Sequence, residues 1–307
     1  MPPVAFFGPA GTFAEEALLT QADLAAVERV PIASIPDLVA AVEAGEHELG
    51  FVPIENSIEG SVSITLDTLA FDSDLLIQRE VDLPIAMGLF AKPGTKLADV
   101  RQVLSFPIAA AQCRGFLRAK LPHATFVAAN STADASATVA RSKRRDQAAI
   151  GNPLAASLYG LKVLAREIAD HPENQTRFVV VGRGIPAPSG HDKTSIVCFQ
   201  RADRPGSLLA MLQEFAARRI NLTKLESRPT KQSLGDYCFF IDIEGHISDE
   251  LVADCLRTLA AKVAHVKYLG SYPVAGIDGP ARRSAATKAW RDADRWVREL
   301  RDQVRDN

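Results

Sequence analysis

The sequence is poor in cysteine. Only 4 of its 307 residues are cysteines, and they stand at Cys113, Cys198, Cys238 and Cys255. No two of them have the close spacing of a metal-binding or redox pair, and the chain lacks the dense cysteine pattern of a disulfide-stabilised secreted domain. We therefore expect reduced thiols.

The chain also lacks an excess of charge. The net charge is -2 at pH 7 and the isoelectric point is near 6.3. This balance gives no electrostatic reason to expect a nucleic acid partner. One basic cluster is made of Arg141, Lys143, Arg144 and Arg145. It has no interleaved aromatic residues and suits the C-terminus of a helix.

Long apolar runs are absent as well. No run approaches the length of a membrane-spanning helix. The N-terminal apolar run is short and no basic segment precedes it, so it does not have the pattern of a signal peptide. We expect a cytoplasmic protein without a membrane association.

What the chain does contain is a recurring pattern of strand, polar residues and helix. Residues 4–7 predict a strand, residues 8–11 a tight turn, and Thr12 with Glu15 a capping box that begins a helix. A strand, a glycine turn and a helix N-terminus together make a natural anion site. Taken alone, however, the motif is better explained as a helix cap without a ligand than as an anion site.

The same pattern returns several times and predicts an α/β fold with mostly parallel strands. Further strands are expected at 49–54, 75–81, 85–91, 103–107, 125–129 and 147–151, and helices at 36–44 and around 109–117. Polar residues follow these strands at Glu55, Asn56, Ser57, Ser105, 130–132 and Asn152. Lys and Arg are scarce there, so backbone N–H groups would carry much of any anion binding. Turns and helix caps explain the same residues without a ligand.

The segment 174–178, Asn-Gln-Thr-Arg-Phe, runs directly into three valines. The valines predict a buried strand. Because side chains alternate along a strand, Thr176 and Phe178 share one face and Arg177 points the other way. A polar strand edge without function fits the pattern about as well as a binding site does. Glu55 and Glu59 are not a good glycosidase pair, because nothing fixes their separation.

Residues 184–190 resemble a linker, and a new unit follows. We expect strands at 194–200, 221–227, 237–243 and 266–269, and helices at 207–218 and 249–262. This βαββαβ order is the ferredoxin-like arrangement, which alone gives no function. An Arg-rich helix at about 281–304, with Trp290, Trp296, Val297 and Leu300, would pack on the body or on another subunit.

Taken together, the motifs resemble those of the prephenate dehydratase family. They are Gly8-Pro9-Ala10-Gly11-Thr12-Phe13, Pro53-Ile54-Glu55-Asn56-Ser57, Ala111-Gln112-Cys113 and Asn174-Gln175-Thr176-Arg177-Phe178. Arg204-Pro205-Gly206-Ser207-Leu208 and Glu226-Ser227-Arg228-Pro229 resemble the phenylalanine-sensing motifs of an ACT regulatory domain. Two positions depart from these patterns. Phe106 stands where the family usually has His, so no imidazole is required there, and Ser207 stands where the ACT motif commonly has Ala.

The resemblance implies a two-lobed catalytic domain like a type 2 periplasmic binding protein, plus a ferredoxin-like ACT domain. The expected boundaries are 1–183 for the catalytic domain, 184–193 for the linker, 194–273 for the ACT domain and 274–307 for a helical tail. Lobe one would hold about 1–80 and 174–183, and lobe two about 81–173. The implied reaction converts prephenate to phenylpyruvate with loss of water and carbon dioxide, without a metal or an organic cofactor.

The resemblance also implies site residues. The catalytic residue would be Thr176, as a hydrogen-bond donor to the departing hydroxyl. Substrate-binding residues would be Thr12, Glu55, Asn56, Ser57, Ser105, Gln112, Asn174, Arg177 and Phe178. Substrate contact by Arg177 stays open, because strand alternation argues that it faces away. Phenylalanine would bind Arg204, Pro205, Gly206, Ser207, Leu208, Leu209, Glu226, Ser227, Arg228 and Pro229, between paired ACT domains.

Two alternative functions and the oligomeric state remain open at the level of the sequence. Arogenate dehydratase performs the same chemistry on an amino acid. A non-catalytic cytosolic amino-acid sensor would also combine two lobes with an ACT domain. ACT pairing implies a homo-oligomer, either a dimer or a tetramer.

Overall fold

The computed structural model describes residues 3–200, 205–231, 236–276, 292 and 295–303. The chain divides into two compact units. The first comprises Met1–Thr68 and Val81–Val181, and the second comprises Leu69–Glu80 and Gly182–Asn307. None of the described helices is long and apolar enough to cross a membrane.

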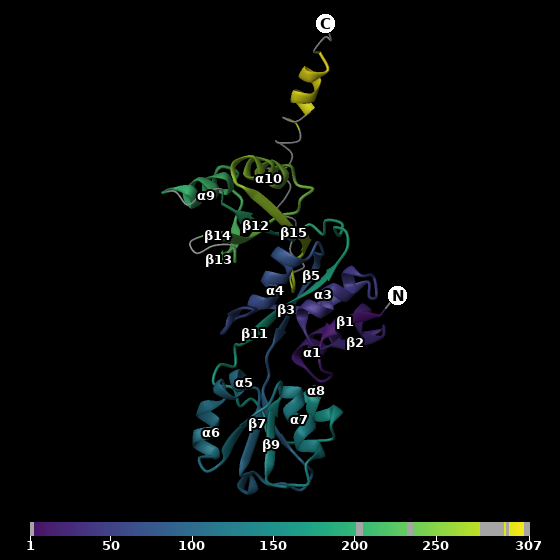
Figure 1. Cartoon of the computed structure of the whole chain (residues 1–307), viewed down its shortest axis with the longest axis vertical. Helices are drawn as coiled ribbons and strands as arrows, with labels where there is room; N and C mark the ends of the chain where they lie inside the picture. The colour runs from purple at the N-terminus through teal and green to yellow at the C-terminus, as the bar shows by residue number, and fades with distance from the viewer. Residues whose placement is uncertain (1–2, 201–204, 232–235, 277–291, 293–294, 304–307) are drawn as a thin grey trace. The chain divides into compact units, whose positions relative to one another are not determined.

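Lobe one of the first unit is built on a mixed sheet with the order β2-β1-β3-β11-β5, and β4 pairs with β3 at the edge of this path (Figure 1). The strands are β1 (Val4–Phe7), β2 (Arg29–Ile32), β3 (Leu49–Asn56), β4 (Gly60–Ser61), β5 (Leu76–Pro84) and β11 (Gln175–Gly182). The helices are α1 (Phe13–Leu19), α2 (Ala22–Ala25), α3 (Ile35–Glu43) and α4 (Ser63–Asp67). A π-helical turn, Thr68–Asp72, follows α4.

Lobe two contains a second mixed sheet, in the order β10-β6-β9-β7-β8. Its strands are β6 (Gly88–Ala91), β7 (Gln102–Ser105), β8 (Thr125–Ala128), β9 (Gln147–Gly151) and β10 (Lys162–Ala165). Its helices are α5 (Pro107–Ala111), α6 (Arg114–Lys120), α7 (Thr132–Arg141) and α8 (Pro153–Leu158). Buried apolar residues of both lobes, such as Val4, Phe51, Leu89 and Ile150, belong to one core cluster.

The structure corrects three sequence-based expectations. The sheets are mixed rather than mostly parallel, because β11 runs antiparallel to β3 and β6 runs antiparallel to β9. The strand expected to end at 81 continues through Pro84, which as a terminal strand residue needs no ladder hydrogen bond from its nitrogen. The helix expected around 109–117 divides into α5 and α6, with Gln112 and Cys113 at the division.

The second unit has the βαββαβ order expected for a ferredoxin-like fold. Its elements are β12 (Asp192–Phe199), α9 (Ser207–Ala217), β13 (Leu222–Pro229), β14 (Tyr237–Glu244), α10 (Glu250–Lys262) and β15 (His265–Pro273). The sheet order is β13-β14-β12-β15, and every pair is antiparallel. Ile196, Phe215, Ile241 and Leu259 are fully buried in its core.

The segment Leu69–Glu80 groups with the second unit, although the sequence-based division placed it in lobe one. Glu80 forms a buried ion pair with Lys193, at 2.8 Å between Oε2 and Nζ. Phe71 packs edge-on against Phe199, with ring centroids 6.0 Å apart. The tail helix expected at about 281–304 lies mostly outside the described residues, Trp290 included, and in its described part Trp296 is exposed.

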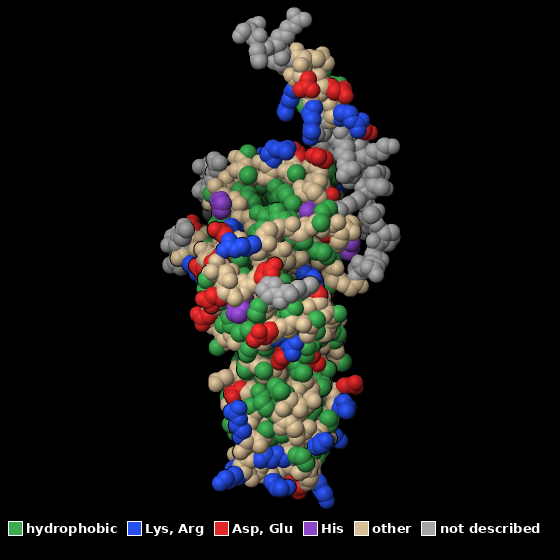
Figure 2. All heavy atoms as spheres, turned by 90° about the vertical axis from the view of Figure 1, so that its right-hand side faces the viewer, with side chains coloured by type: hydrophobic (Ala, Val, Ile, Leu, Met, Phe, Trp, Pro, Cys, Tyr) green, Lys and Arg blue, Asp and Glu red, His purple; other side chains and the backbone are tan. Residues whose placement is uncertain are grey.

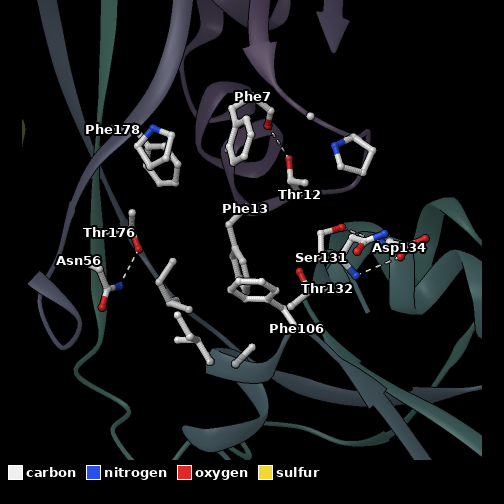
Figure 3. A pocket seen from close by; sticks show the side chains of 18 of the residues that line it. Phe7, Thr12, Phe13, Asn56, Phe106, Ser131, Thr132, Asp134, Thr176 and Phe178 are labelled. Atoms are coloured by element: carbon white, nitrogen blue, oxygen red, sulfur yellow. Dashed lines mark hydrogen bonds between the residues drawn. The ribbon is translucent and has the colours of Figure 1, made fainter. Parts of the chain in front are cut away.

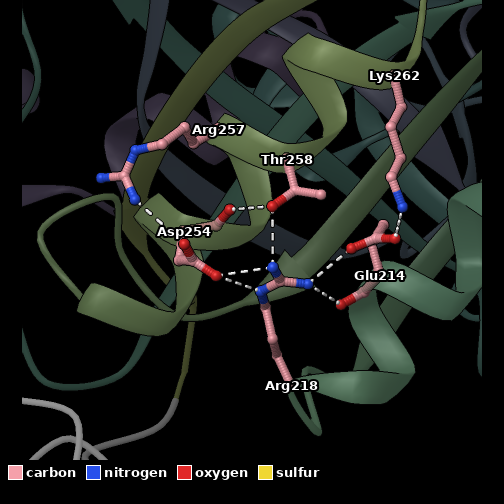
Figure 4. A network of polar contacts seen from close by, with 6 residues as sticks. All are labelled: Glu214, Arg218, Asp254, Arg257, Thr258 and Lys262. Atoms are coloured by element: carbon pink, nitrogen blue, oxygen red, sulfur yellow. Dashed lines mark hydrogen bonds and ion pairs between the residues drawn. The ribbon is translucent and has the colours of Figure 1, made fainter. Parts of the chain in front are cut away.

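An ion-pair network joins α9 to α10 in the second unit (Figure 4). Arg218 contacts Glu214 at 2.8 Å, Asp254 at 2.7 Å and the Thr258 hydroxyl at 2.9 Å. Lys262 also pairs with Glu214. These cations, Lys262 first, hold the pKa of Glu214 below its ordinary value. The stability contributed by Glu214 is therefore complete at pH values above the pKa that Glu214 has in the unfolded chain. It is lost as the pH falls through the lower pKa that Glu214 has in the folded protein.

Removing the Arg218 side chain should destabilise this unit. We expect Arg218→Ala to lower the free energy of unfolding by about 2 kcal/mol, because several charge-assisted hydrogen bonds to a largely buried guanidinium are lost together. Urea unfolding at neutral pH measures this change. The matched control is Arg257→Ala, since Arg257 is 73% exposed and makes one contact with Asp254. It should cost less than about 0.5 kcal/mol, and equal effects of both variants would contradict the prediction.

Candidate active site

A cavity of about 840 Å³ lies between lobe one and lobe two of the first unit. Figure 3 shows Thr176 and Asn56 on one side of it and Ser131, Thr132 and Asp134 on another. Most of the remaining lining is apolar, and it includes the aromatic residues Phe7, Phe13, Phe106 and Phe178. A cavity of this size with few convergent polar groups is typical of a small-molecule site.

The antiparallel pairing of β11 with β3 brings Thr176 to this cavity. Thr176 lies opposite Asn56, and Phe178 lies opposite Pro53. Both Thr176 and Phe178 line the cavity, whereas Arg177 does not. The Arg177 guanidinium instead lies 3.0 Å from a carboxylate oxygen of Glu55. The prediction from strand alternation is thus confirmed for these three side chains.

The Asn56 side chain holds the hydroxyl of Thr176. Its Oδ1 accepts the backbone N–H groups of Ile58 and Glu59, both at 3.0 Å. This turn aims the Asn56 amide nitrogen at Thr176, to which it donates at 2.8 Å. Because Thr176 Oγ1 accepts this hydrogen bond, its own hydrogen is left for another acceptor. Within the described residues no protein acceptor for that hydrogen is found, and Thr176 lines the cavity.

Two helix starts also reach the lining. At α1 the Thr12 hydroxyl accepts the N–H of Glu15 at 3.4 Å. The Glu15 carboxylate accepts the backbone N–H of Gly11 at 2.7 Å. The capping box expected from the sequence would have used the N–H of Thr12, one residue later. At α7 the Ser131 hydroxyl accepts the N–H of Asp134 at 2.9 Å. The first N–H groups of a helix have no intrahelical acceptor, so α7 presents donors at the cavity edge.

The cavity lacks cationic side chains. Among the described residues, its lining contains no Lys, Arg or His, and its only carboxylates are Glu59 and Asp134. Figure 2 shows many Lys and Arg side chains gathered at the lower end of lobe two, away from α5 and α8 in Figure 1. An anionic ligand in this cavity would therefore depend on backbone and amide N–H groups, as the scarcity of basic residues in the motifs predicts.

Six of the expected substrate-binding and catalytic residues line the cavity, and four do not. The six are Thr12, Asn56, Gln112, Asn174, Thr176 and Phe178. Of the four, Glu55 pairs with Arg177 on the other face of the strands. Ser57 is turned to Asn174 and to the N–H of Gln175, at 3.3 and 3.0 Å. Ser105 is fully buried and donates to the carbonyl of Ile150 at 3.1 Å.

Sequence reasoning did not single out several residues that line the cavity. Ser131 and Thr132 belong to a polar cap that is visible in the sequence, but a cap alone does not indicate a ligand. Phe106, at the N-cap position of α5, is 40% exposed. Figure 3 shows it among the residues that line the cavity, whereas the sequence indicated it only as a departure from the motif. Glu59 entered the sequence argument only as a rejected glycosidase residue.

Cys113 lies directly after Gln112 and is fully buried, with its sulfur 3.6 Å from that of Met87. Burial raises the pKa of its thiol to about 12, so a thiolate nucleophile is not available there. Over the described part of the chain, no cluster of three His, Cys, Asp or Glu side chains is arranged to hold a metal ion.

The second unit contains a cavity of about 460 Å³. Of the expected phenylalanine-binding residues, Gly206, Ser207, Leu208 and Leu209 line it, together with Gln200, Leu212, Tyr237 and Phe239. Pro205 is exposed beside it, and Arg204 lies outside the described residues. The second motif, 226–229, lies on the edge strand β13 and not in this lining. There Glu226 pairs with Arg228 at 3.2 Å.

Comparison with known proteins agrees with this architecture. A model of the prephenate dehydratase family matches residues 4–185, and a model of the ACT domain matches residues 194–261. A prephenate dehydratase of Mycolicibacterium vanbaalenii is 43% identical over 98% of this chain and 99% of its own.

Solved structures give the same result. A prephenate dehydratase of Arthrobacter aurescens in complex with L-Phe superposes with a TM-score of 0.89 at 38% identity, covering 98% of this chain and 99% of its own. GqqA, described as a novel type of quorum quenching acylase, superposes with a TM-score of 0.80 at 30% identity, covering 92% of this chain and all of its own. The motif resemblance and the two-lobed fold with an ACT domain are confirmed. The chain therefore belongs to the prephenate dehydratase family.

Proposed function

We propose that this chain converts prephenate to phenylpyruvate in L-phenylalanine biosynthesis, under feedback regulation by phenylalanine. The observation that carries the proposal is the Thr176 hydroxyl, which accepts a hydrogen bond from Asn56 at 2.8 Å at the edge of an apolar cavity. The cavity is large enough for a cyclohexadiene ring and its side chain. Membership of the family makes this reaction the first to test.

The reaction requires one proton for each turnover. The prephenate dianion and a proton give phenylpyruvate, carbon dioxide and water. The ring hydroxyl departs as the carboxylate is lost, and the ring becomes aromatic. A hydrogen-bond donor aimed at the departing oxygen lowers the barrier, because negative charge develops on that oxygen. Thr176 donates this hydrogen bond, and the apolar lining, which includes Phe178, excludes water.

Binding of the two carboxylates falls to neutral donors in this proposal. The amide groups of Gln112, Asn174 and Asn130 and the N–H groups at the start of α7 lie around the cavity. Helix N-termini bind anions through their free N–H groups and the helix dipole. The absence of cations from the described lining also lowers the cost of releasing the more weakly charged product.

Arogenate is the second candidate substrate, and one observation favours it. The described lining contains two carboxylates, Glu59 and Asp134, and no cationic side chain. Arogenate carries an ammonium where prephenate carries a ketone, and a carboxylate in the cavity would attract that group. Prephenate remains our first choice because the curated relatives are named for it.

An acylase activity fits the cavity less well. A threonine that attacks an acyl group needs a base to accept its proton. The described partner of Thr176 is the amide nitrogen of Asn56, which donates a hydrogen bond and accepts no proton. The hydroxyl is therefore held as a donor rather than as a nucleophile.

Regulation would use the second unit. The cavity beside Gly206 would hold phenylalanine, and the motif at 226–229 would come from the ACT domain of a second copy. This arrangement requires a homo-oligomer, a dimer or a tetramer. The linker expected at 184–193 between the two functional parts also belongs to the proposal, although its last two residues are already part of β12. A location in the cytoplasm belongs to the proposal as well.

The test is turnover by the purified chain. We expect phenylpyruvate to form from prephenate, more slowly from arogenate, and less of it when phenylalanine is added. Absorbance of phenylpyruvate in alkali measures the product, and size-exclusion chromatography with light scattering measures the oligomer. Faster conversion of arogenate would reverse the order of the two substrates. No conversion of either would leave the sensor interpretation in first place.

A further inference from the structure

A continuous chain of side-chain hydrogen bonds leads from Thr176 to Glu59. The Asn56 amide nitrogen donates to Thr176 Oγ1 and to Asn174 Oδ1, both at 2.8 Å. Asn174 donates to Gln112 Oε1 at 3.0 Å. Gln112 in turn donates to a carboxylate oxygen of Glu59 at 2.8 Å. All five residues line the cavity.

The direction of this chain is fixed by groups that have only one hydrogen-bonding role. At one end, two backbone N–H groups donate to Asn56 Oδ1. Asn56 therefore presents its nitrogen to Asn174, which must present its oxygen in return. At the other end, Gln112 presents its nitrogen to a carboxylate oxygen of Glu59. Both ends agree with the same orientation of all three amides.

This chain of side-chain hydrogen bonds also joins the two lobes. Asn56 ends β3 and Glu59 lies in the β3–β4 turn of lobe one, and Gln112 ends α5 of lobe two. Asn174 lies just before β11, and its carbonyl accepts the N–H of Ile85 at 2.8 Å, where the chain passes between the lobes. Gln112 and Asn174 are buried, with 8% and 1% exposure, so water competes little for their hydrogen bonds.

We propose that Glu59 is a positioning residue for the reaction. The backbone N–H groups of Ile58 and Glu59 set which way the Asn56 amide faces. Through Gln112 and Asn174, the Glu59 side chain keeps that amide, and hence the Thr176 hydroxyl, in its place at the cavity. Asn174 is the buried middle of this chain. The role rests on the proposed dehydratase function, because the hydrogen is used on the departing oxygen. Glu59 acts through Gln112 and not on the substrate.

The experiment measures kcat and KM for prephenate in variants of Glu59. Glu59→Ala should lower kcat about tenfold and change KM less than about threefold. The Thr176 hydroxyl is then held less firmly, while Asn130 and the N–H groups at the start of α7, which are not part of this hydrogen-bonded chain, still bind the carboxylates. Glu59→Gln should recover most of kcat, since its amide oxygen can accept from Gln112. The matched control is Glu48→Ala, which removes an exposed carboxylate of lobe one outside the cavity and should leave both constants unchanged.

A double-mutant cycle tests whether Glu59 acts through Gln112. In a Gln112→Ala background, Glu59→Ala should cause no further loss of kcat. If the loss of kcat in the double variant equalled the product of the two single losses, the proposal would be overturned. An unchanged kcat in Glu59→Ala would overturn it too. If Glu59→Gln were as inactive as Glu59→Ala, Glu59 would be the source of the proton, which would also overturn the positioning role.

A second readout does not depend on turnover. The side-chain amide protons of Gln112 and Asn174, followed by NMR, should exchange slowly with water in the unmodified protein and faster in Glu59→Ala. If prephenate is not converted but exchange depends on Glu59, the proposed function fails and the hydrogen-bonded chain stands. If exchange is the same in both proteins, Glu59 does not hold these hydrogen-bonded side chains, and the proposal is wrong whatever the substrate.

Discussion

Thr176→Val is expected to lower kcat for prephenate about 100-fold to 1,000-fold, the usual cost of removing one preorganised donor from a site of developing charge. Valine keeps the branching and nearly the volume of threonine, so β11 and its pairing with Asn56 should persist. Only the hydroxyl is lost. The measurement is steady-state phenylpyruvate formation, with KM expected to change little because the ring oxygen gains its charge only in the transition state.

Thr176→Ser is the matched control. It restores the hydroxyl within reach of the Asn56 nitrogen and removes only a methyl group. We expect it to stay within about tenfold of the unmodified enzyme, since a freer χ1 angle reduces the fraction of correctly oriented hydroxyl. Activity of Thr176→Val near that of the unmodified chain would remove Thr176 from the mechanism. Equal losses in Val and Ser would point to packing rather than to the hydroxyl.

The side of β11 that each residue occupies was accessible from the sequence. Alternation has a period of two and depends only on the local backbone, so Thr176 and Phe178 could be separated from Arg177 without knowledge of the fold. The partner of β11 was not accessible. Its antiparallel pairing with β3 places the start of β11 beside the end of β3. Only this tertiary contact explains why Asn56 and Thr176, far apart in the chain, form a hydrogen bond.

Polar residues at strand ends were a less reliable guide, as Ser105 shows. It lies near the end of the strand predicted at 103–107 and before a helix, and in the structure it ends β7 and donates to the carbonyl of Ile150 in the neighbouring β9. Thr12 meets the same sequence criterion and does line the cavity. The difference is that Ser105 still lies within its strand and faces the neighbouring one, whereas Thr12 lies beyond β1 at the N-cap of α1. A strand boundary predicted to within a few residues does not decide this.

The link between Glu59 and Gln112 could not be predicted at all. Glu59 lies in a tight turn of lobe one, and Gln112 lies at the division of two helices that the sequence indicated as one. Their hydrogen bond spans 53 positions and depends on how the two lobes close. A motif search finds each residue separately, while the direction of the amide chain emerges only when backbone donors fix one end of it.

Regulation gives the prediction with the second largest effect. Gly206 is the N-cap of α9 with φ +86°, and nothing lies within 4 Å of the position that a Cβ would take. The carboxylate of phenylalanine would approach the N–H groups that follow it, in the cavity that Gly206 lines. Gly206→Ala should raise the phenylalanine concentration for half-inhibition about 100-fold, because two hydrogen bonds to a charged group are worth at least about 2.7 kcal/mol.

The control for this variant is Gly184→Ala, which has nearly the same φ, +84°, and equally open space around the added carbon. Both variants bear the same backbone cost, but only Gly206 lines the cavity. Inhibition should persist in Gly184→Ala, and kcat without phenylalanine should stay within about twofold in both, since coupling acts only when the effector is bound. Loss of inhibition in both variants would assign the effect to backbone strain. Unchanged inhibition in Gly206→Ala would place the phenylalanine site elsewhere, because a methyl group in the path of the carboxylate must weaken phenylalanine binding if the site is here.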